Sequence, residues 1–351
     1  MEAEEIPATD SRVTFVGRAL TEDGSLRFDR PSTYFRVAFA GKTLAMRVSD
    51  TQRNYYAIWV DSPTHKSPTR IVEVKGNDTI IDVVLPADVK RSKVKEHQVV
   101  IQKRTEAGCG TTMVYAFITD GKFIQAEPFK ERQIEFIGDS YTCGYGVDAP
   151  NRMDKFTDET ENASRTYASI VSRYFNADYM TIAHSGRGIC RNAESKIPWE
   201  VMPDLYQYTL DRDSTTRWSV SSSEFRPDLT VIYLGANDFS GWMMPDNKKF
   251  NKGYLRLLSE IKANYGEEHP ILCMTPGPYE FLFLYVRDVV NNCGMKNVYF
   301  LGHCPMIHNE TNEDLGAGWH PNYNGQLKIA HALIPYIATI TGWGLQDVLV
   351  K

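Results

Sequence analysis

The sequence has 351 residues, of which 42% are hydrophobic and 24% charged, the balance of a globular protein that can bury a core. Its formal net charge of -5 at pH 7 argues against nucleic acid or an anionic membrane as the main partner, because both bind basic surfaces. The length favours two domains.

The chain start and the cysteines bear on location. The acidic segment Met1 to Ile6 has no apolar core like that of a secretory signal, and no apolar run reaches the roughly 18 residues that cross a membrane. The six cysteines are irregularly spaced, without a Cys-x-x-Cys pair. Free thiols are therefore expected rather than a zinc site or a disulfide framework. We predict a cytoplasmic protein that needs no metal or other cofactor.

Short strands separated by turns are expected over residues 13–126. The run Thr33 to Phe39 alternates at the period of a half-buried strand. Further strands are expected at 12–16, 43–48, 55–60, 70–74, 79–85, 97–103 and 113–118. Turn signals such as Gly76-Asn77-Asp78 separate them. This spacing predicts a β-sandwich over residues 1–128, with a jelly roll as its form. A packed appendage is favoured over a carbohydrate-binding module, since no catalytic constellation or aromatic platform is visible there.

From residue 129 to residue 351 strands alternate with helices, the pattern of a three-layer α/β/α domain with a parallel sheet. Strands are expected at 133–137, 179–183, 229–234, 271–274 and 298–301, and helices at 167–175, 252–265, 281–293 and 323–341. The first three strands end in glycine-containing loops that carry Ser140, Gly186 and Asn237. Because the carboxyl ends of parallel strands meet at one edge, these loops should open together.

A nucleophile and its oxyanion hole can be sought at that edge. The first strand ends abruptly in Gly138-Asp139-Ser140, where the glycine permits a tight turn. Ser140 is the candidate nucleophile, and the alternative is that Asp139 and Ser140 only cap the next segment. The backbone N–H groups of Ser140 and Gly186 and the side-chain amide of Asn237 are candidate oxyanion donors. The alternatives are a plain turn at Gly186 and a helix cap at Asn237.

The base that a serine nucleophile needs is expected at His320. This residue lies in Gly318 to Asn322, after the last strand and before the last helix, where Pro321 fixes the exit and Asn322 is a good N-cap. Other histidines lie in loops, at strand starts, beside a cysteine or inside a helix: His65, His97, His269, His303, His308 and His331.

Four short blocks of the sequence resemble those of SGNH (GDSL-type) hydrolases in order and approximate spacing. They are Gly138-Asp139-Ser140, Ser185-Gly186, Gly235-Ala236-Asn237-Asp238 and His320-Pro321. Together with an N-terminal sandwich, the run 133–146 and Ser185-Gly186-Arg187-Gly188 resemble carbohydrate esterase family two. That family joins a jelly roll to an SGNH domain and removes acetyl groups from xylan and related sugars. The resemblance implies Ser140 as nucleophile, His320 as base, and Gly186 and Asn237 as oxyanion donors.

One position departs from the SGNH pattern. An aspartate usually stands three residues before the histidine, and here that residue is Ala317. One interpretation is that His320 works in a Ser–His dyad whose Nδ1–H is held by a backbone carbonyl, as the resemblance to some members of the esterase family implies. The alternative is that a nearby carboxylate reaches it, from Asp314, Glu313 or Glu310. The dyad is favoured, because glycines at 316 and 318 let the backbone approach closely.

The expected reaction is hydrolysis of acetyl esters on an acetylated xylo-oligosaccharide or a similar sugar ester. Trp242, Trp319 and Tyr141 are candidate sugar contacts, and the alternative is that these rings pack between loops. One rival is an SGNH lipase or thioesterase, which calls for an apolar acyl groove, whereas the loops near Ser140 are polar and aromatic. Another is a non-catalytic carbohydrate-binding protein. A homo-oligomer is left open.

Overall fold

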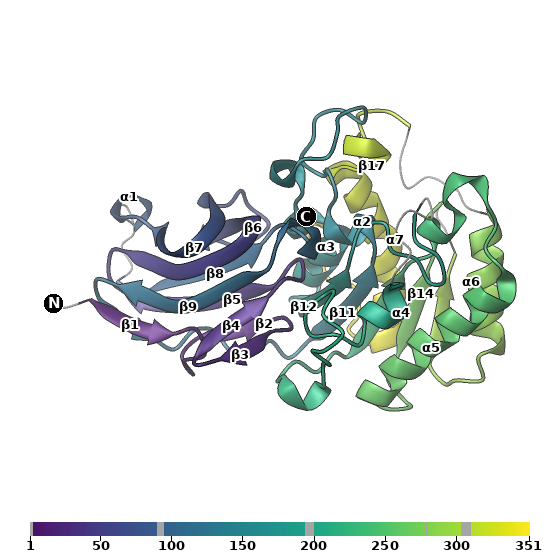
Figure 1. Ribbon diagram of the computed structural model, residues 1–351, viewed down its shortest axis with the longest axis horizontal. Helices are drawn as coiled ribbons and strands as arrows, with labels where there is room; N and C mark the ends of the chain where they lie inside the picture. The colour runs from purple at the N-terminus through teal and green to yellow at the C-terminus, as the bar shows by residue number, and fades with distance from the viewer. Residues whose placement is uncertain (1–2, 90–94, 194–199, 278–279, 303–309) are drawn as a thin grey trace. The chain divides into compact units, whose positions relative to one another are not determined.

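The computed structural model describes residues 3–351 except 90–94, 194–199, 278–279 and 303–309 (Figure 1). The chain divides into two compact units, Met1–Phe129 and Lys130–Lys351. None of the described helices is long and apolar enough to cross a membrane.

The first unit contains an antiparallel sheet of ten strands (Figure 1). Its strands are β1 (Glu4–Pro7), β2 (Thr14–Val16), β3 (Leu20–Glu22), β4 (Ser25–Phe28), β5 (Tyr34–Ala40), β6 (Leu44–Val60), β7 (Arg70–Val84), β8 (His97–Lys103), β9 (Thr112–Thr119) and β10 (Lys122–Ile124). The short helix α1 (Pro86–Val89) follows β7. The main path runs β10-β5-β8-β6-β9-β4-β3, with β1 on β9, β2 on β5 and β7 on β6. A cluster of buried apolar side chains that includes Phe28, Phe35, Phe39 and Phe117 forms its core.

The expected strand-rich first domain is confirmed, and its strands pair antiparallel, but the turn expected at Gly76-Asn77-Asp78 is wrong. These residues lie inside β7, so the strands expected at 70–74 and 79–85 are one strand. The register of β6 against β7 shifts between Asp50 and Arg53, opposite Gly76, whose φ is +77°. A bulge therefore absorbs the glycine without ending the strand. The strands join one hydrogen-bonded sheet, and the jelly-roll form of the expected sandwich stays a prediction.

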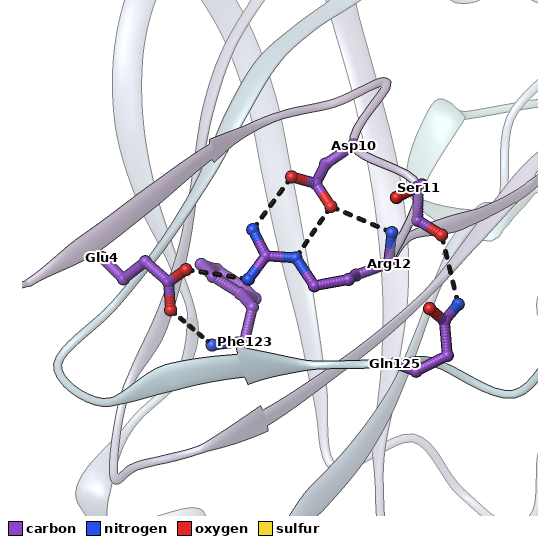
Figure 2. Close-up of polar contacts among 6 residues, drawn as sticks. All are labelled: Glu4, Asp10, Ser11, Arg12, Phe123 and Gln125. Atoms are coloured by element: carbon purple, nitrogen blue, oxygen red, sulfur yellow. Dashed lines mark hydrogen bonds and ion pairs between the residues drawn. The ribbon is translucent and has the colours of Figure 1, made fainter.

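A salt-bridged clamp ties the first strand of this unit to the last (Figure 2). The Arg12 guanidinium donates to Glu4 at 2.9 Å and to both carboxylate oxygens of Asp10 at 2.9 Å. The other Glu4 oxygen accepts from the Phe123 backbone N–H at 2.7 Å. The hydrogen bond from Arg12 lowers the pKa of Asp10. The start of the chain is thereby fixed against β10.

The second unit is built on a parallel sheet in the order β12-β11-β13-β14-β15 (Figure 1). Its strands are β11 (Gln133–Gly138), β12 (Asp178–Ala183), β13 (Leu229–Tyr233), β14 (Ile271–Met274) and β15 (Val298–Leu301). Its longer helices are α3 (Tyr167–Tyr174), α5 (Asn247–Tyr265), α6 (Glu280–Asn292) and α7 (Tyr323–Thr341), and its short ones are α2 (Ser140–Cys143) and α4 (Met202–Leu205). Helix α3 packs on α7, and α5 packs on α6. The chain leaves β11 toward β12 on one side and reaches β13 on the other, so a switch point lies beside β11, where open sheets bind ligands.

The predicted α/β alternation is confirmed. The expected strands at 271–274 and 298–301 and the expected helix at 323–341 have the observed bounds of β14, β15 and α7. Helix α5 starts at Asn247, before the expected residue 252, because the Asp246 side chain caps it by accepting from the Lys249 N–H at 2.8 Å.

A polar network surrounds Glu135 of this sheet. The carboxylate of Glu135 in β11 accepts from the hydroxyls of Tyr265 at 2.9 Å, Tyr206 at 3.2 Å and Thr230 at 3.2 Å. Thr230 also hydrogen-bonds the Nε2 atom of His269 at 2.8 Å. Burial, together with the charge of Lys262, lowers the pKa of His269 to about 4. The fold thus holds a neutral histidine.

This burial predicts a loss of stability in acid. Between the ordinary pKa of 6.5 and about 4, His269 takes up a proton in the unfolded chain and not in the folded one. Unfolding is therefore favoured as the pH falls, and this residue alone should lower the free energy of unfolding by up to about 3 kcal/mol. His269→Gln keeps a donor for Thr230 and does not titrate, so its stability should fall less between about pH 7 and about pH 4.5. Urea denaturation of both proteins measures the difference, and equal pH dependence would contradict this account.

Candidate active site

Ser140 lies at the turn between β11 and α2. Asp139 is the N-cap of α2, and its Oδ1 accepts from the Tyr141 N–H at 3.2 Å. A Cβ at Gly138 would clash with the Thr142 side chain, so the turn requires glycine there. Ser140 is the first residue of the helix and is 8% exposed. Its backbone N–H is among the first N–H groups of the helix, which have no partner within the helix itself.

His320 reaches Ser140 from a small ribbon near the chain end. The ribbon pairs β16 (Leu315–Gly316) with β17 (His320–Pro321). The Nε2 atom of His320 lies 2.8 Å from Ser140 Oγ, and its Nδ1 atom lies 2.9 Å from the Gly318 carbonyl oxygen. A carbonyl only accepts, so Nδ1 carries the proton. The Nε2 lone pair is then directed at the serine hydroxyl.

The turn that carries His320 is fixed by backbone hydrogen bonds. The N–H groups of residues 317, 318 and 319 donate to the carbonyls of Gly146, Asp154 and Arg152 at 3.2, 3.1 and 3.2 Å. Gly318 and Trp319 both have left-handed backbones, with φ of +59° and +63°. The segment 146–154, which follows α2, therefore serves as the frame for the histidine turn.

The structure directs Asp314 elsewhere. Its Oδ2 pairs with the Lys328 Nζ at 2.5 Å, and its side chain is 1% exposed. Glu310 and Glu313, the other carboxylates considered, are exposed. Ala317 is fully buried and packs closely on Gly146. A Cβ added at Gly146 would lie 2.5 Å from the Cβ of Ala317. At Nδ1, His320 has a carbonyl partner, as the dyad interpretation expects.

Asn237 links the first two loops of the sheet edge. It lies in the 3-10 helix Ala236–Trp242 that follows β13. Its Nδ2 donates to Asp139 Oδ2 at 3.0 Å and to the Arg187 carbonyl at 2.9 Å. Both protons of the amide are thereby engaged, one of them by the residue that precedes Ser140. Gly186, at φ +78°, is in the turn after β12.

The neighbouring Asp238 anchors the second loop to the third. It is fully buried, and its carboxylate accepts from the N–H groups of Ile189 and Cys190 at 2.8 Å and of Arg191 at 3.0 Å. Burial raises the pKa of Asp238, although these hydrogen bonds oppose the rise. A Cβ at Gly188 would clash with Arg191 and Asp238, so glycine is required for this approach.

Sequence reasoning missed a buried histidine–aspartate pair beside this loop. His184 Nδ1 lies 2.5 Å from Asp211 Oδ2, directly before Ser185 and Gly186. The Asp211 side chain is fully buried. His184 follows a strand end just as Ser140 does, which is the signal that could have found it. The sequence identifies Asp139 only as a candidate cap and carries no signal of its bond to Asn237.

The three candidate sugar contacts differ in environment. Tyr141 packs edge-to-face on Tyr233 and His320, with ring centroids 5.9 and 5.5 Å apart, so its ring belongs to the wall of the site. Trp319 is 46% exposed, and the Arg152 guanidinium lies 4.5 Å from its ring centre. The side chain of Trp242 lies outside the described part of the structure.

Comparison with known proteins identifies both units. The carbohydrate esterase 2 N-terminal domain matches residues 15–128, and the GDSL-like lipase/acylhydrolase family matches residues 136–327. Cellulase/esterase CelE of Acetivibrio thermocellus is 36% identical over 255 residues, which are 70% of this chain and 30% of CelE. This chain therefore spans less than a third of the length of CelE.

Two further relatives match most of the chain. An acetylxylan esterase / glucomannan deacetylase of Cellvibrio japonicus is 28% identical over 342 residues, 92% of this chain and 89% of that protein. The solved structure of a family two carbohydrate esterase from Clostridium thermocellum in complex with cellohexaose is 29% identical, with a TM-score of 0.83 over 94% of this chain and 99% of that chain.

The contacts of Asp314 predict a small effect of its removal. Because Gly318 rather than Asp314 bonds His320 Nδ1, Asp314→Ala should keep turnover of 4-nitrophenyl acetate within about tenfold of the parent. Asp314→Asn is the matched control for volume. A collapse of kcat by several orders of magnitude in both folded variants would instead identify Asp314 as a third member of the site.

The Asp139–Asn237 hydrogen bond predicts a coupled loss. Removing one oxyanion donor in Asn237→Ala should lower kcat by on the order of 10²–10³. Asp139→Asn should lower it by about tenfold, because the amide loses its charged acceptor. If Asp139 acts through Asn237, the double variant should be no slower than Asn237→Ala alone. Steady-state rates of the three variants test this, and additive losses would show that the two residues act separately.

Proposed function

This chain belongs to the GDSL-like lipase/acylhydrolase family and carries a carbohydrate esterase 2 N-terminal domain, and we propose that it is a carbohydrate O-deacetylase of the acetyl xylan esterase type. The observation that carries the proposal is the 2.8 Å contact between Ser140 Oγ and His320 Nε2 at the carboxyl edge of the parallel sheet. The relative from Cellvibrio japonicus, matched over 92% of this chain, supports acetylated polysaccharide as the substrate class.

In the first step His320 takes the Ser140 proton on Nε2 while Ser140 Oγ attacks the acetyl carbonyl carbon. The carbonyl oxygen becomes an oxyanion, and the N–H groups of Ser140 and Gly186 and the Asn237 amide stabilise it. Collapse of this intermediate breaks the bond to the sugar oxygen, which leaves with the proton from His320. Ser140 is left as an acetyl ester.

In the second step a water molecule replaces the sugar. His320 takes a proton from the water as its oxygen attacks the acetyl-enzyme, and the same donors hold the second oxyanion. Release of acetate returns the proton to Ser140. No metal or other cofactor takes part in the proposed reaction.

A carbonyl partner for His320 selects the tautomer and leaves the imidazolium without an adjacent negative charge. In a triad the carboxylate does both jobs. The 2.9 Å contact between Nδ1 and Gly318 supports a dyad for this protein.

Two alternatives are separated from this proposal by their substrates. An SGNH lipase or thioesterase should prefer a long acyl chain, whereas a deacetylase should prefer an acetyl ester to an octanoyl ester. A non-catalytic carbohydrate-binding protein should bind the oligosaccharide and release no acetate. The 2.8 Å contact of Ser140 Oγ with His320 Nε2 pairs a nucleophile with a base, and so favours the enzyme.

The exact substrate, its aromatic contacts, the location of the protein and the form of the N-terminal sheet are further parts of the proposal. We propose acetylated xylo-oligosaccharide as substrate, with Trp319 and Trp242 as sugar contacts and Tyr141 in the wall of the site. A cytoplasmic location is supported by free thiols at the five described cysteines. The jelly-roll form of the N-terminal sheet is supported by the matching esterase domain.

The proposal predicts that Ser140→Ala and His320→Ala each lower kcat for acetate release from acetylated xylan by at least about 10³-fold. Ser221→Ala and His331→Ala are matched controls, because both residues are exposed and lie outside the site. The same assay with octanoyl esters measures chain-length preference. Rates near those of the parent in either site variant would exclude the mechanism, and faster octanoyl turnover would favour the lipase alternative.

A further inference from the structure

His320 lies at the end of a stack of three rings. The ring centroids of Tyr145 and His320 are 4.3 Å apart with an interplanar angle of 33°. Those of Tyr145 and Phe156 are 4.4 Å apart at 27°. Two rings this close and this nearly parallel to Tyr145 must occupy its opposite faces. One face of Tyr145 therefore covers the imidazole, and the other is backed by Phe156.

The backbone around Tyr145 is hydrogen-bonded to the turns that carry Ser140 and His320. Gly144 and Gly146 flank it with left-handed φ values of +83° and +62°. The Tyr145 N–H donates to the Ser140 carbonyl at 3.1 Å, and the Gly146 carbonyl accepts from the Ala317 N–H at 3.2 Å. The segment that carries the ring thus also holds the serine turn and the histidine turn.

Gly318 leaves room for this contact. A Cβ on Gly318 would lie 3.2 Å from Tyr145 Cε1 and 3.5 Å from His320 Nδ1. The residue whose carbonyl bonds Nδ1 therefore lacks the side chain that would crowd the tyrosine. The carbonyl bond and the ring contact fit together around one imidazole.

We propose that Tyr145 is a positioning residue that stabilises the protonated imidazole of His320 during acyl transfer. This rests on the proposed function, in which His320 carries a positive charge in both steps. The Gly318 carbonyl accepts the Nδ1 proton and bears no negative charge. A cation within about 6 Å of an aromatic face is attracted by the negative face of the ring. The Tyr145 ring thus supplies part of the stabilisation that an aspartate gives in a triad.

Charged and titratable groups around His320 are held by other partners. Asp139 bonds Asn237, Asp314 pairs with Lys328, and Arg152 stacks on Trp319. Tyr141 presents its ring at 75° to the imidazole and 5.5 Å away, an edge-to-face contact. Asp154 on the segment 146–154 and Tyr323 on α7 are further titratable groups on elements that contact the His320 turn. Their effects stay constant when only the electrons of the Tyr145 ring are changed.

The test replaces Tyr145 by phenylalanine and by phenylalanines with one, two and three ring fluorines, which hold the shape and weaken the negative face stepwise. The pH dependence of kcat/KM on 4-nitrophenyl acetate reports when the base becomes protonated. Weaker attraction disfavours the protonated imidazole. The acid limb should therefore move stepwise to lower pH, by about half to one pH unit in total relative to Tyr145→Phe. The plateau rate should fall along the same series.

A second readout does not depend on activity. The NMR titration of the His320 ring proton, assigned by its loss in His320→Asn, should move in the same direction by the same amount. The same fluorinated residues at Phe156, one ring further away, are the control and should shift the midpoint less. A midpoint that stays fixed across the Tyr145 series would overturn the proposal, even where the rate falls. Absence of ester hydrolysis in the parent protein would instead reject the proposed function, and the titration would still decide the contact.

Discussion

The hydrogen bond between His320 Nδ1 and the Gly318 carbonyl is the interaction on which the geometry of the site depends. It decides which nitrogen carries the proton, and so turns the lone pair of Nε2 toward Ser140. The bond exists because the turn from Ala317 to Trp319 is left-handed at two successive residues. Three N–H groups of that turn are held by the segment after Ser140. Ser140 and His320, the candidate nucleophile and the candidate base, lie far apart in the sequence and are thereby aligned by main-chain atoms.

Two carboxylates act on this site through the groups that they hydrogen-bond. Asp139 orients the amide of Asn237, and Asp238 collects three backbone N–H groups of the preceding loop. Burial of Asp238 disfavours its charge and raises its pKa, and the three donors offset part of that cost. The loops that follow β11, β12 and β13 are joined to one another by these hydrogen bonds. Preorganisation of this kind lets oxyanion donors act without reorganising during the reaction.

Much of this architecture follows from the sequence, because strand ends in a parallel sheet share one edge. That rule places Ser140, Gly186 and Asn237 in loops on the same edge, while their chemical roles stay predictions. The sequence could not show that Gly76 lies at a bulge rather than in a turn, because glycine permits both. The pairing of β7 with β6 decides between them. Nor could the sequence pair His184 with Asp211 or bring Tyr145 onto His320. Those contacts join residues far apart in the chain and depend on how loops pack, which carries no local periodicity.

The carbonyl partner of His320 has a consequence for how this site tolerates genetic change. An aspartate in that role depends on a single side chain, and one base change in its codon can remove that side chain. The Gly318 carbonyl is present whatever amino acid stands there, so no substitution deletes the atom itself. The site is instead sensitive to replacement of Gly318, because its φ of +59° is one that residues with a side chain adopt rarely. The orientation of His320 therefore depends on a backbone angle rather than on the identity of an acidic side chain.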